Sequence, residues 1–433
     1  MWDQKWEAMS SDEMQAWQLD KLRETVAWVS ARVPFYRSKF AALNLCADDI
    51  RELSDLARFS FTIKTDLRDT YPVGMYAVPM KDIVRIHASS GTTGKPITGA
   101  YTAEDMSHWA ECSARCLTAW GVTAQDLCQI SYGYGLFTGG LGIHAGAERL
   151  GAAVLPASSG MTERQITLMR DFKVNALFCT PSYALTMVDK ATELGVDIRE
   201  LPLRVGGFGA EPWSLEMKRE IEARMGIKAH NVYGLTEMMG PCLSFSCEAE
   251  DGYMHINEDH FIAEIIDPAT EEVLPLGEQG ELVLTAIQRR AMPLIRYRTR
   301  DITSLKREKC ACGRTLVKMG RIYGRSDDMM IINGVNVFPN QVESILLDVP
   351  EVEPQYVLII RKKGRLDALS VDVEAKPSVY EQGEEVLVGL EKKISDKIRG
   401  VIGIGIEVHL VAPRSLTRSE GKARRIFDAR QRS

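Results

Sequence analysis

A run of hydroxyl, glycine and lysine residues near position 90 has the composition of a phosphate-binding loop. Its glycines let the backbone approach an anion, and successive backbone N–H groups can form an anion-binding concavity. Expected strands at 84–88 and 97–101 flank the run, which fits neither the spacing nor the strand-to-helix setting of the G-x-x-x-x-G-K-[ST] loop. A flexible Ser/Gly linker is the alternative interpretation. The run consists of Ser89, Ser90, Gly91, Thr92, Thr93, Gly94 and Lys95, followed by Pro96.

Further along the chain, at wide spacing, come residues whose side chains could contact other parts of a phosphate-containing ligand. Tyr233, Gly234, Thr236 and Glu237 come directly after an expected strand. They offer an aromatic face, a hydroxyl donor and a hard carboxylate oxygen for a divalent cation. Taken singly, each group could be a packed turn or a surface residue, so the interpretation depends on their order along the chain.

The run at 89–96 resembles the signature loop of the acyl-adenylate-forming superfamily, which includes acyl-CoA synthetases, peptide-synthetase adenylation domains and luciferases. The resemblance implies that this loop closes over the β- and γ-phosphates of ATP. It implies that Tyr233 stacks on adenine, that Thr236 contacts the α-phosphate and that Glu237 helps to hold Mg²⁺. It also implies a ribose contact at Asp301, a ribose or phosphate contact at Arg325, and an adenine-side loop at Gly209, Ala210 and Glu211.

Two positions near the C-terminal end resemble the moving parts of that superfamily. Asp327 lies in a stretch similar to the superfamily hinge, and Lys422 lies in a Gly-Lys context similar to that of the adenylating lysine. A cation is needed because the attack of a carboxylate on the α-phosphate brings two anions together. Rotation about Asp327 would then withdraw Lys422 and present another face for a thiol. The alternative for Lys422 is a solvated basic tail, and its motif is looser than usual.

Several stretches between about residue 30 and residue 430 resemble phenylacetate–CoA ligases in particular: 61–68, 133–140, 180–183, 209–213, 258–261 and 334–339. This resemblance implies an ATP-dependent, AMP-forming ligase of aromatic acid catabolism that joins phenylacetate, or a close aryl analogue, to coenzyme A. It also implies that Tyr134, Phe137, Gly139 and Gly140 line the acyl pocket, where the glycines leave space for a flat ring. Core packing is an equally good explanation of the two aromatic residues.

Cys247, His255, Cys310 and Cys312 could form a Cys₃His zinc site. Zinc favours four sulfur or nitrogen ligands, and a close pair such as Cys310 and Cys312 often starts such a site. The role would be structural because protein would fill all four positions. The alternative is a set of unpaired thiols.

The elements that must position these residues change in character along the chain. From about residue 84, short apolar runs alternate with amphipathic helices, which predicts an α/β domain. Thr102 with Asp105 has the form of a capping box that begins a helix, and Ser214 and Gly226 are expected to begin and end another. We expect an N-terminal adenylate-forming domain at 1–326, with a small β subdomain at about 245–320. A smaller mobile α+β domain is expected at 327–433, with a continuous helix at 380–398 among its elements.

Bulk composition excludes several other classes of function. The chain has 433 residues and a formal net charge of -6, so a nucleic-acid partner held by phosphate contacts is not expected. No apolar run reaches the length of a membrane span and no signal peptide is evident, so we expect a cytoplasmic protein. The resemblance implies a homodimer. Two alternatives stay open: an adenylating enzyme with another acceptor, such as a deazaflavin coenzyme or a carrier protein, and a non-catalytic nucleotide-binding regulator.

Overall fold

The computed structural model describes residues 1–89, 96–249, 252–326, 330–332, 335–363, 366–417 and 425–429. Their contacts divide the chain into two compact units. Unit 1 comprises Met1–Cys179, Arg199–Ala210 and Ile227–Arg321. Unit 2 comprises Thr180–Ile198, Glu211–Gly226 and Ile322–Ser433. The domain boundary expected between residues 326 and 327 stays a prediction.

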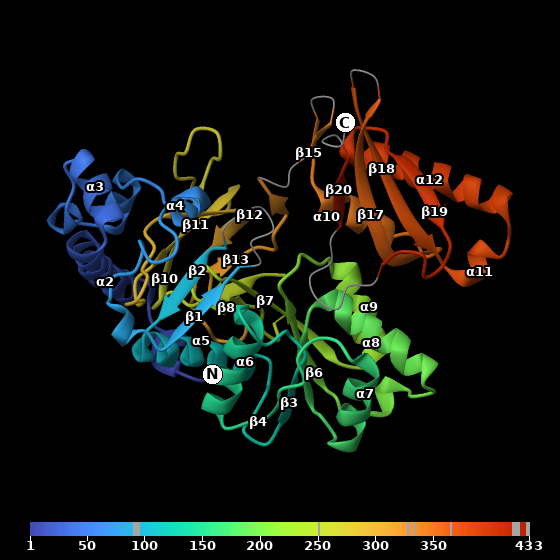
Figure 1. The fold of residues 1–433 in the computed structure, drawn as a ribbon, viewed down its shortest axis with the longest axis horizontal. Coiled ribbons are helices and arrows are strands. Elements are labelled where there is room, and N and C mark those ends of the chain that lie inside the picture. Colours follow the sequence, from blue (N-terminus) through green and yellow to red (C-terminus); the bar gives the residue numbers. More distant parts are fainter. Residues whose placement is uncertain are drawn as a thin grey trace. The chain divides into compact units, whose positions relative to one another are not determined.

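The main sheet of unit 1 follows the strand order β10-β11-β12-β13-β9-β8-β7-β6-β5-β3-β4 (Figure 1). Pairing from β4 to β7 is parallel, and pairing from β7 to β10 is antiparallel. Every residue of β5 and β6 is buried, as expected for parallel strands covered on both faces. The strands are β3 (Leu127–Ile130), β4 (Ala153–Leu155), β5 (Ala176–Cys179), β6 (Val205–Gly209), β7 (Lys228–Leu235), β8 (Gly240–Phe245), β9 (Met254–Ile256), β10 (Phe261–Ile266), β11 (Gln279–Ala286), β12 (Tyr297–Lys306) and β13 (Lys318–Met319).

The stretch expected to form a β subdomain supplies β9 to β13, and these strands hydrogen-bond into the same sheet as the parallel strands. A separate two-stranded antiparallel hairpin precedes them, formed by β1 (Arg85–Ala88) and β2 (Thr98–Tyr101). Ala88 pairs with Thr98, so the predicted phosphate loop connects the two strands. The strand predictions on both sides of that loop are therefore confirmed.

Helix α5 begins where the sequence predicts. Thr102 is its N-cap and forms a capping box with Asp105, which satisfies backbone donors in the first turn. Gly146 lets α6 approach α5 closely, because a Cβ there would lie 2.3 Å from Ser113 Cβ. The helices of unit 1 are α1 (Gln4–Glu7), α2 (Ser11–Arg32), α3 (Pro34–Ala42), α4 (Lys64–Asp69), α5 (Ala103–Ala119), α6 (Thr138–Leu150) and α7 (Thr162–Asp171).

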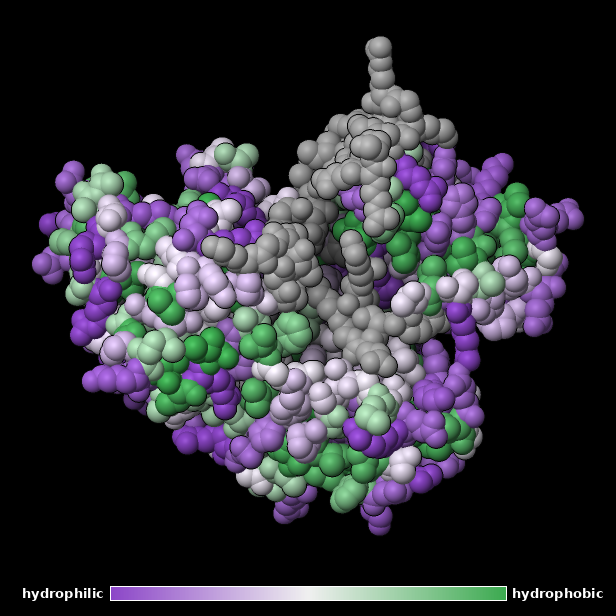
Figure 2. Space-filling view, viewed as in Figure 1, coloured by the Kyte–Doolittle hydropathy of each residue, from purple (hydrophilic) through white to green (hydrophobic). Residues whose placement is uncertain are grey.

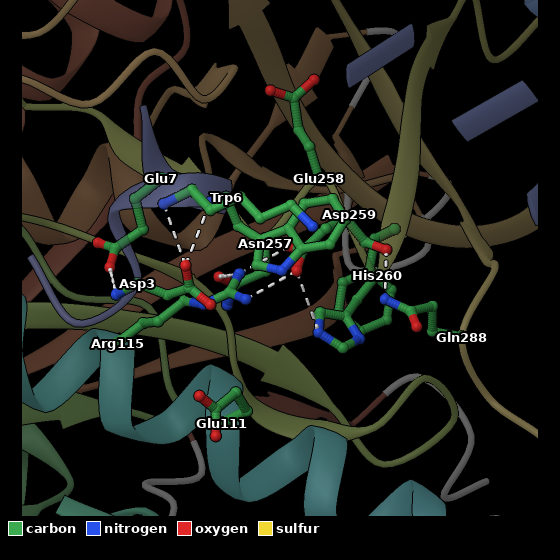
Figure 3. A network of polar contacts seen from close by, with 12 residues as sticks. Asp3, Trp6, Glu7, Glu111, Arg115, Asn257, Glu258, Asp259, His260 and Gln288 are labelled. Atoms are coloured by element: carbon green, nitrogen blue, oxygen red, sulfur yellow. Dashed lines mark hydrogen bonds and ion pairs between the residues drawn. The ribbon is translucent and has the colours of Figure 1, made fainter. Parts of the chain in front are cut away.

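A buried ion pair fastens α5 to the connection between β9 and β10 (Figure 3). Arg115 donates to both carboxylate oxygens of Asp259 at 2.7 Å, and both side chains are 1% exposed. The Trp17 indole donates to Asp259 O at 3.1 Å, and the Gln18 amide donates to Glu258 O at 2.9 Å. The connection therefore holds both α2 and α5 in place.

Unit 2 contains a four-stranded sheet in the order β19-β18-β17-β20. Its core includes Ile345 and Leu346 of α10, Leu358 of β17, and Ile394 and Ile398 of α12. The unit consists of α8 (Pro181–Glu193), α9 (Leu215–Met225), β14 (Gly324–Arg325), β15 (Met330–Ile332), β16 (Val335–Val337), α10 (Pro339–Leu347), β17 (Val352–Lys363), β18 (Leu366–Ala375), α11 (Pro377–Tyr380), α12 (Glu384–Ile402), β19 (Glu407–Val411) and β20 (Ile426–Asp428).

The helix expected at 380–398 was placed wrongly at its start. Helix α11 ends at Tyr380, and α12 begins after Gly383, whose φ of +95° is strained for residues with a Cβ. Gly383 therefore separates two helices. Within the described residues, no helix combines the length and apolar character that crossing a membrane requires.

Candidate active site

The residues predicted to contact the α-phosphate and Mg²⁺ lie in the turn between β7 and β8. Leu235 pairs with Gly240, so residues 236–239 form the turn. Gly234 has to be glycine here, because a Cβ would lie 1.9 Å from Gly240 O. Glu237 is 8% exposed, so its position is fixed by packing while part of it still reaches solvent.

The predicted adenine and ribose contacts meet directly. The Tyr233 hydroxyl donates a hydrogen bond of 2.6 Å to Asp301 Oδ2. Asp301 lies on β12, where its backbone N–H donates to Thr299 Oγ1 at 3.1 Å. The side chains that the resemblance assigns to the two halves of a nucleoside are thus neighbours in unit 1.

The hairpin that carries the predicted phosphate loop packs against the same turn. A Cβ at Gly99 would lie 3.1 Å from Thr236 O, and the Tyr101 hydroxyl donates to Met239 O at 3.1 Å. At the start of the loop, Ser89 N donates to Ile97 O at 2.8 Å. The other predicted loop residues, Ser90, Gly91, Thr92, Thr93, Gly94 and Lys95, lie outside the described residues, as do Asp327 and Lys422.

The expected acyl-pocket residues lie beside the end of β1. Leu136 O accepts from Ala88 N at 2.9 Å. A Cβ at Gly140 would lie 3.2 Å from the Tyr134 ring, and one at Gly139 would lie 3.5 Å from the Tyr132 ring, so both glycines make room for aromatic side chains.

The two aromatic candidates differ in their surroundings. The Tyr134 hydroxyl lies 3.0 Å from His144 Nδ1, and burial raises the pKa of Tyr134. Phe137 is 52% exposed. Apolar side chains reach the surface of unit 1 over β1 and β2 (Figure 2), with Val84 and Ile86 among the exposed residues.

The predicted adenine-side loop begins where β6 ends. Gly209 is the last residue of β6, and a Cβ there would lie 2.3 Å from Val232 O, so the site requires glycine. Ala210 has a φ of +69°. In unit 2, Glu211 Oε1 accepts from Ser182 N at 2.8 Å, and Arg325 is half-buried on β14.

The four predicted zinc ligands come together in unit 1. Their ligand atoms all lie within 4.8 Å of one another. Cys247 Sγ lies 3.7 Å from Cys310 Sγ, and Cys312 Sγ lies 3.5 Å from His255 Nε2. Hydrogen bonds from Cys247 and His255 lower the pKa of the Cys312 thiol, so this sulfur carries negative charge most readily.

Sequence reasoning missed Arg289, which reaches the turn at 236–239 from the segment after β11. Its side chain is 2% exposed and donates to the backbone carbonyls of Glu237 and Met238. In the sequence it is one of two adjacent arginines, a pattern typical of a solvated surface. No local signal separates Arg289 from Arg290.

Known proteins match this chain over nearly its whole length. The AMP-binding enzyme family matches residues 31–288, and the AMP-binding enzyme C-terminal domain matches residues 334–430. A phenylacetate–coenzyme A ligase of Aromatoleum evansii is 48% identical over 98% of this chain and 96% of its own length. One from Thermus thermophilus is 45% identical over 100% of both chains.

A solved structure shares the fold. The crystal structure of 2-hydroxyisobutyryl-CoA ligase in the postadenylation state, in complex with R3-HIB-AMP, superposes with a TM-score of 0.93 at 28% identity. The match covers 98% of this chain and 92% of the other. By sequence and by fold, this chain belongs to the AMP-binding enzymes and, among them, to the phenylacetate–coenzyme A ligase family.

Proposed function

We propose that this chain is an AMP-forming ligase that joins an aryl acid, phenylacetate or a close analogue, to coenzyme A. The observation that carries the proposal is the identity of 45–48% with phenylacetate–coenzyme A ligases over nearly the whole chain. The arrangement of unit 1 supports it. The Tyr233 hydroxyl bonds to Asp301, and the turn at 236–239, which follows Tyr233 closely in the chain, contacts the hairpin that carries the predicted phosphate loop.

In the first step, a carboxylate oxygen of the acid attacks the α-phosphorus of ATP and pyrophosphate leaves. Tyr233 and Asp301 orient the nucleoside, Thr236 contacts the α-phosphate and Glu237 offers a carboxylate oxygen to Mg²⁺. Lys422, outside the described residues, reduces the repulsion between the two anions. Holding the acid and ATP together in this way lowers the entropic part of the activation barrier.

In the second step, the thiolate of coenzyme A attacks the acyl carbonyl carbon, and the bond between that carbon and the oxygen of the AMP phosphate breaks, so that AMP leaves. We assign the change between steps to a movement about Asp327, which also lies outside the described residues. Gly139 and Gly140 allow the Tyr132 and Tyr134 rings to approach α6 closely, and we assign the aryl ring of the acid a place against Tyr134. We also assign Phe137, which is 52% exposed, to this acyl pocket.

The experiment is a pyrophosphate-release screen of the purified chain with ATP and Mg²⁺. The acids are phenylacetate, hydroxyphenylacetates, indoleacetate, benzoates and short fatty acids, each with and without coenzyme A. We expect strongest release with an arylacetate, and AMP release that requires coenzyme A.

Other outcomes would distinguish the alternatives. Acid-dependent pyrophosphate release without any AMP release on addition of coenzyme A would favour another acceptor, such as a deazaflavin coenzyme or a carrier protein. No pyrophosphate release with any acid would favour a nucleotide-binding regulator.

We also propose that Cys247, His255, Cys310 and Cys312 hold a structural zinc ion. In a tetrahedral site with Zn–S near 2.3 Å and Zn–N near 2.0–2.1 Å, ligand atoms are about 3.8 Å apart for two sulfurs and about 3.6 Å for sulfur and nitrogen. The 3.7 Å and 3.5 Å separations match these edges. Four protein ligands leave no open coordination position for a substrate.

This ion would stabilise the attachment of the N-terminal segment. Beside the cysteines, Arg314 forms a buried ion pair with Glu7 at 2.6 Å, and Thr315 donates to Glu7 O and to Met9 O. The knuckle at 310–313 thus fixes the residues that hold α1. We further propose that the chain is a cytoplasmic protein and, from its resemblance to the phenylacetate–coenzyme A ligases, that it forms a homodimer.

A further inference from the structure

We propose that Arg289 is a positioning residue for adenylate formation, which fixes the backbone of the turn at 236–239 against the hairpin that carries the phosphate loop. The inference rests on the proposed function, since it assigns Thr236 and Glu237 to the nucleotide. Arg289 contacts neither the acid nor ATP in this account. It acts through the turn.

The guanidinium of Arg289 joins two separate parts of the site. Its Nη1 donates to Glu237 O at 2.5 Å and also to Met238 O, while its Nη2 donates to Ala100 O on β2 at 3.2 Å. The guanidinium carbon lies 4.7 Å from the centre of the Tyr101 ring, within cation–π range. One rigid fork therefore holds the turn and β2 at a fixed separation.

The surroundings keep this fork in place. The Trp109 ring stacks on Tyr101, with centroids 5.1 Å apart, and its indole N–H donates to Pro241 O at 3.0 Å. Gly99 allows the approach, since a Cβ there would lie 3.1 Å from Thr236 O and 3.2 Å from Arg289 Nη2. A bulkier residue on β2 would push the turn away.

The backbone directly after Arg289 is also held. Asp105 Oδ1 accepts from Arg290 N at 2.6 Å, and Asp105 Oδ2 accepts from Ala291 N at 3.0 Å. Asp105 is fully buried in the first turn of α5. This anchoring directs Arg289 inward, while the Arg290 side chain is 41% exposed and lies 3.8 Å from Glu104.

Burying the Arg289 guanidinium costs free energy, and its hydrogen bonds to backbone carbonyls offset part of that cost. Here its donors meet the Glu237 backbone at the carbonyl oxygen, and among the described residues no ion pair joins it to the Glu237 carboxylate. In the proposed function, that carboxylate offers an oxygen to a divalent cation. We infer that the guanidinium fixes where that carboxylate points.

The test compares Arg289→Met, which keeps length but removes the donors, with Arg289→Lys and the neighbouring control Arg290→Met. Acid-dependent pyrophosphate release is measured over titrations of ATP and Mg²⁺. For Arg289→Met we expect kcat to fall about 10- to 100-fold and the Mg²⁺ midpoint to rise, as for other residues that orient a ligand group. Arg289→Lys should recover part of the loss, and Arg290→Met should match wild type.

A double-mutant cycle with Glu237→Gln separates positioning from a general loss of structure. If Arg289 acts through the turn, the double variant is scarcely slower than Glu237→Gln alone. Multiplicative losses, or an unchanged Mg²⁺ midpoint in Arg289→Met, would overturn the inference. If Arg289→Met does not fold, the same cycle is measured with Arg289→Lys. Wild-type protein that releases no pyrophosphate with any acid contradicts the proposed function instead, and the inference with it.

Discussion

The Tyr233 hydroxyl and the Asp301 carboxylate form a 2.6 Å hydrogen bond between β7 and β12, two strands that are not neighbours in the sheet. One residue is the predicted adenine contact and the other the predicted ribose contact. Because of this bond, each side chain limits where the other can move. The roles that we propose for them therefore place the nucleoside against two residues whose positions depend on each other.

Replacing Asp301 by Asn should raise the KM for ATP by about 10- to 100-fold, because charge-assisted hydrogen bonds to the ribose diol are weakened. Tyr233→Phe keeps the ring and removes only the hydroxyl, so we expect a change below about threefold. Steady-state kinetics with ATP as the varied substrate measure both. Equal effects of the two substitutions would show that Asp301 serves only to hold Tyr233.

Replacing Lys422 by Ala should reduce adenylate formation by several orders of magnitude and leave thioester formation from supplied acyl-adenylate nearly unchanged. The physical reason is that the cation is needed only while two anions approach each other. Lys397→Ala is the matched control, since Lys397 is an exposed lysine paired with Asp348 at 3.1 Å. Equal loss in both half-reactions would contradict the prediction that Lys422 acts in adenylate formation alone.

Purified protein should contain about one zinc ion per chain, the content of one tetrahedral site. Cys310→Ser and Cys312→Ser should lose the metal and lower the melting temperature by more than about 5 °C, since structural zinc contributes directly to folding. Elemental analysis and thermal melts measure both. Cys46→Ser, an exposed cysteine, should change neither. A metal-free wild type with an unchanged melt in chelator would contradict the site.

His260 makes stability depend on pH. Burial lowers its pKa from 6.5 to about 4. The unfolded chain therefore binds this proton more readily, so stability is lost as pH falls from about 6.5 toward about 4. By pH 5 the loss should be on the order of 2 kcal/mol.

Urea unfolding at pH 7 and pH 5 measures this contribution. His260 lies beside Asp259, in the network drawn in Figure 3. The comparison variant is His260→Gln, because glutamine can still form hydrogen bonds there but does not titrate. The variant should lose less stability than wild type between the two pH values, and His409→Gln, on exposed β19 surface, should behave as wild type. Identical losses in all three would contradict the assignment.

Local patterns predicted a large part of the fold. Thr102 with Asp105, and Ser214 with Gly226, mark helix ends because capping depends on nearby residues. Strand β20 was missed, since three residues carry little periodicity and pair only through tertiary contacts with β17. The break at Gly383 was missed because an isolated glycine inside an expected helix is often tolerated.

Within the site, the sequence identified residues whose side chains have recognisable chemistry. It grouped Cys247, His255, Cys310 and Cys312 correctly, as their ligand types restrict the possibilities. It could not identify Arg289 or Trp109, whose partners are backbone carbonyls far away in sequence. A carbonyl acceptor is present at every residue, so the sequence gives no sign of which carbonyl a side chain will find.

The hairpin of β1 and β2 forms a sheet of its own, and among the described residues its strands pair with no strand of the long sheet. Isolated two-stranded ribbons are only marginally stable, so this one depends on side-chain contacts for its orientation. Those contacts include the bonds from Arg289 to Ala100 and from Tyr101 to Met239. A substitution among them would therefore displace the ribbon and its predicted phosphate loop while the ladder hydrogen bonds of the long sheet remain in place.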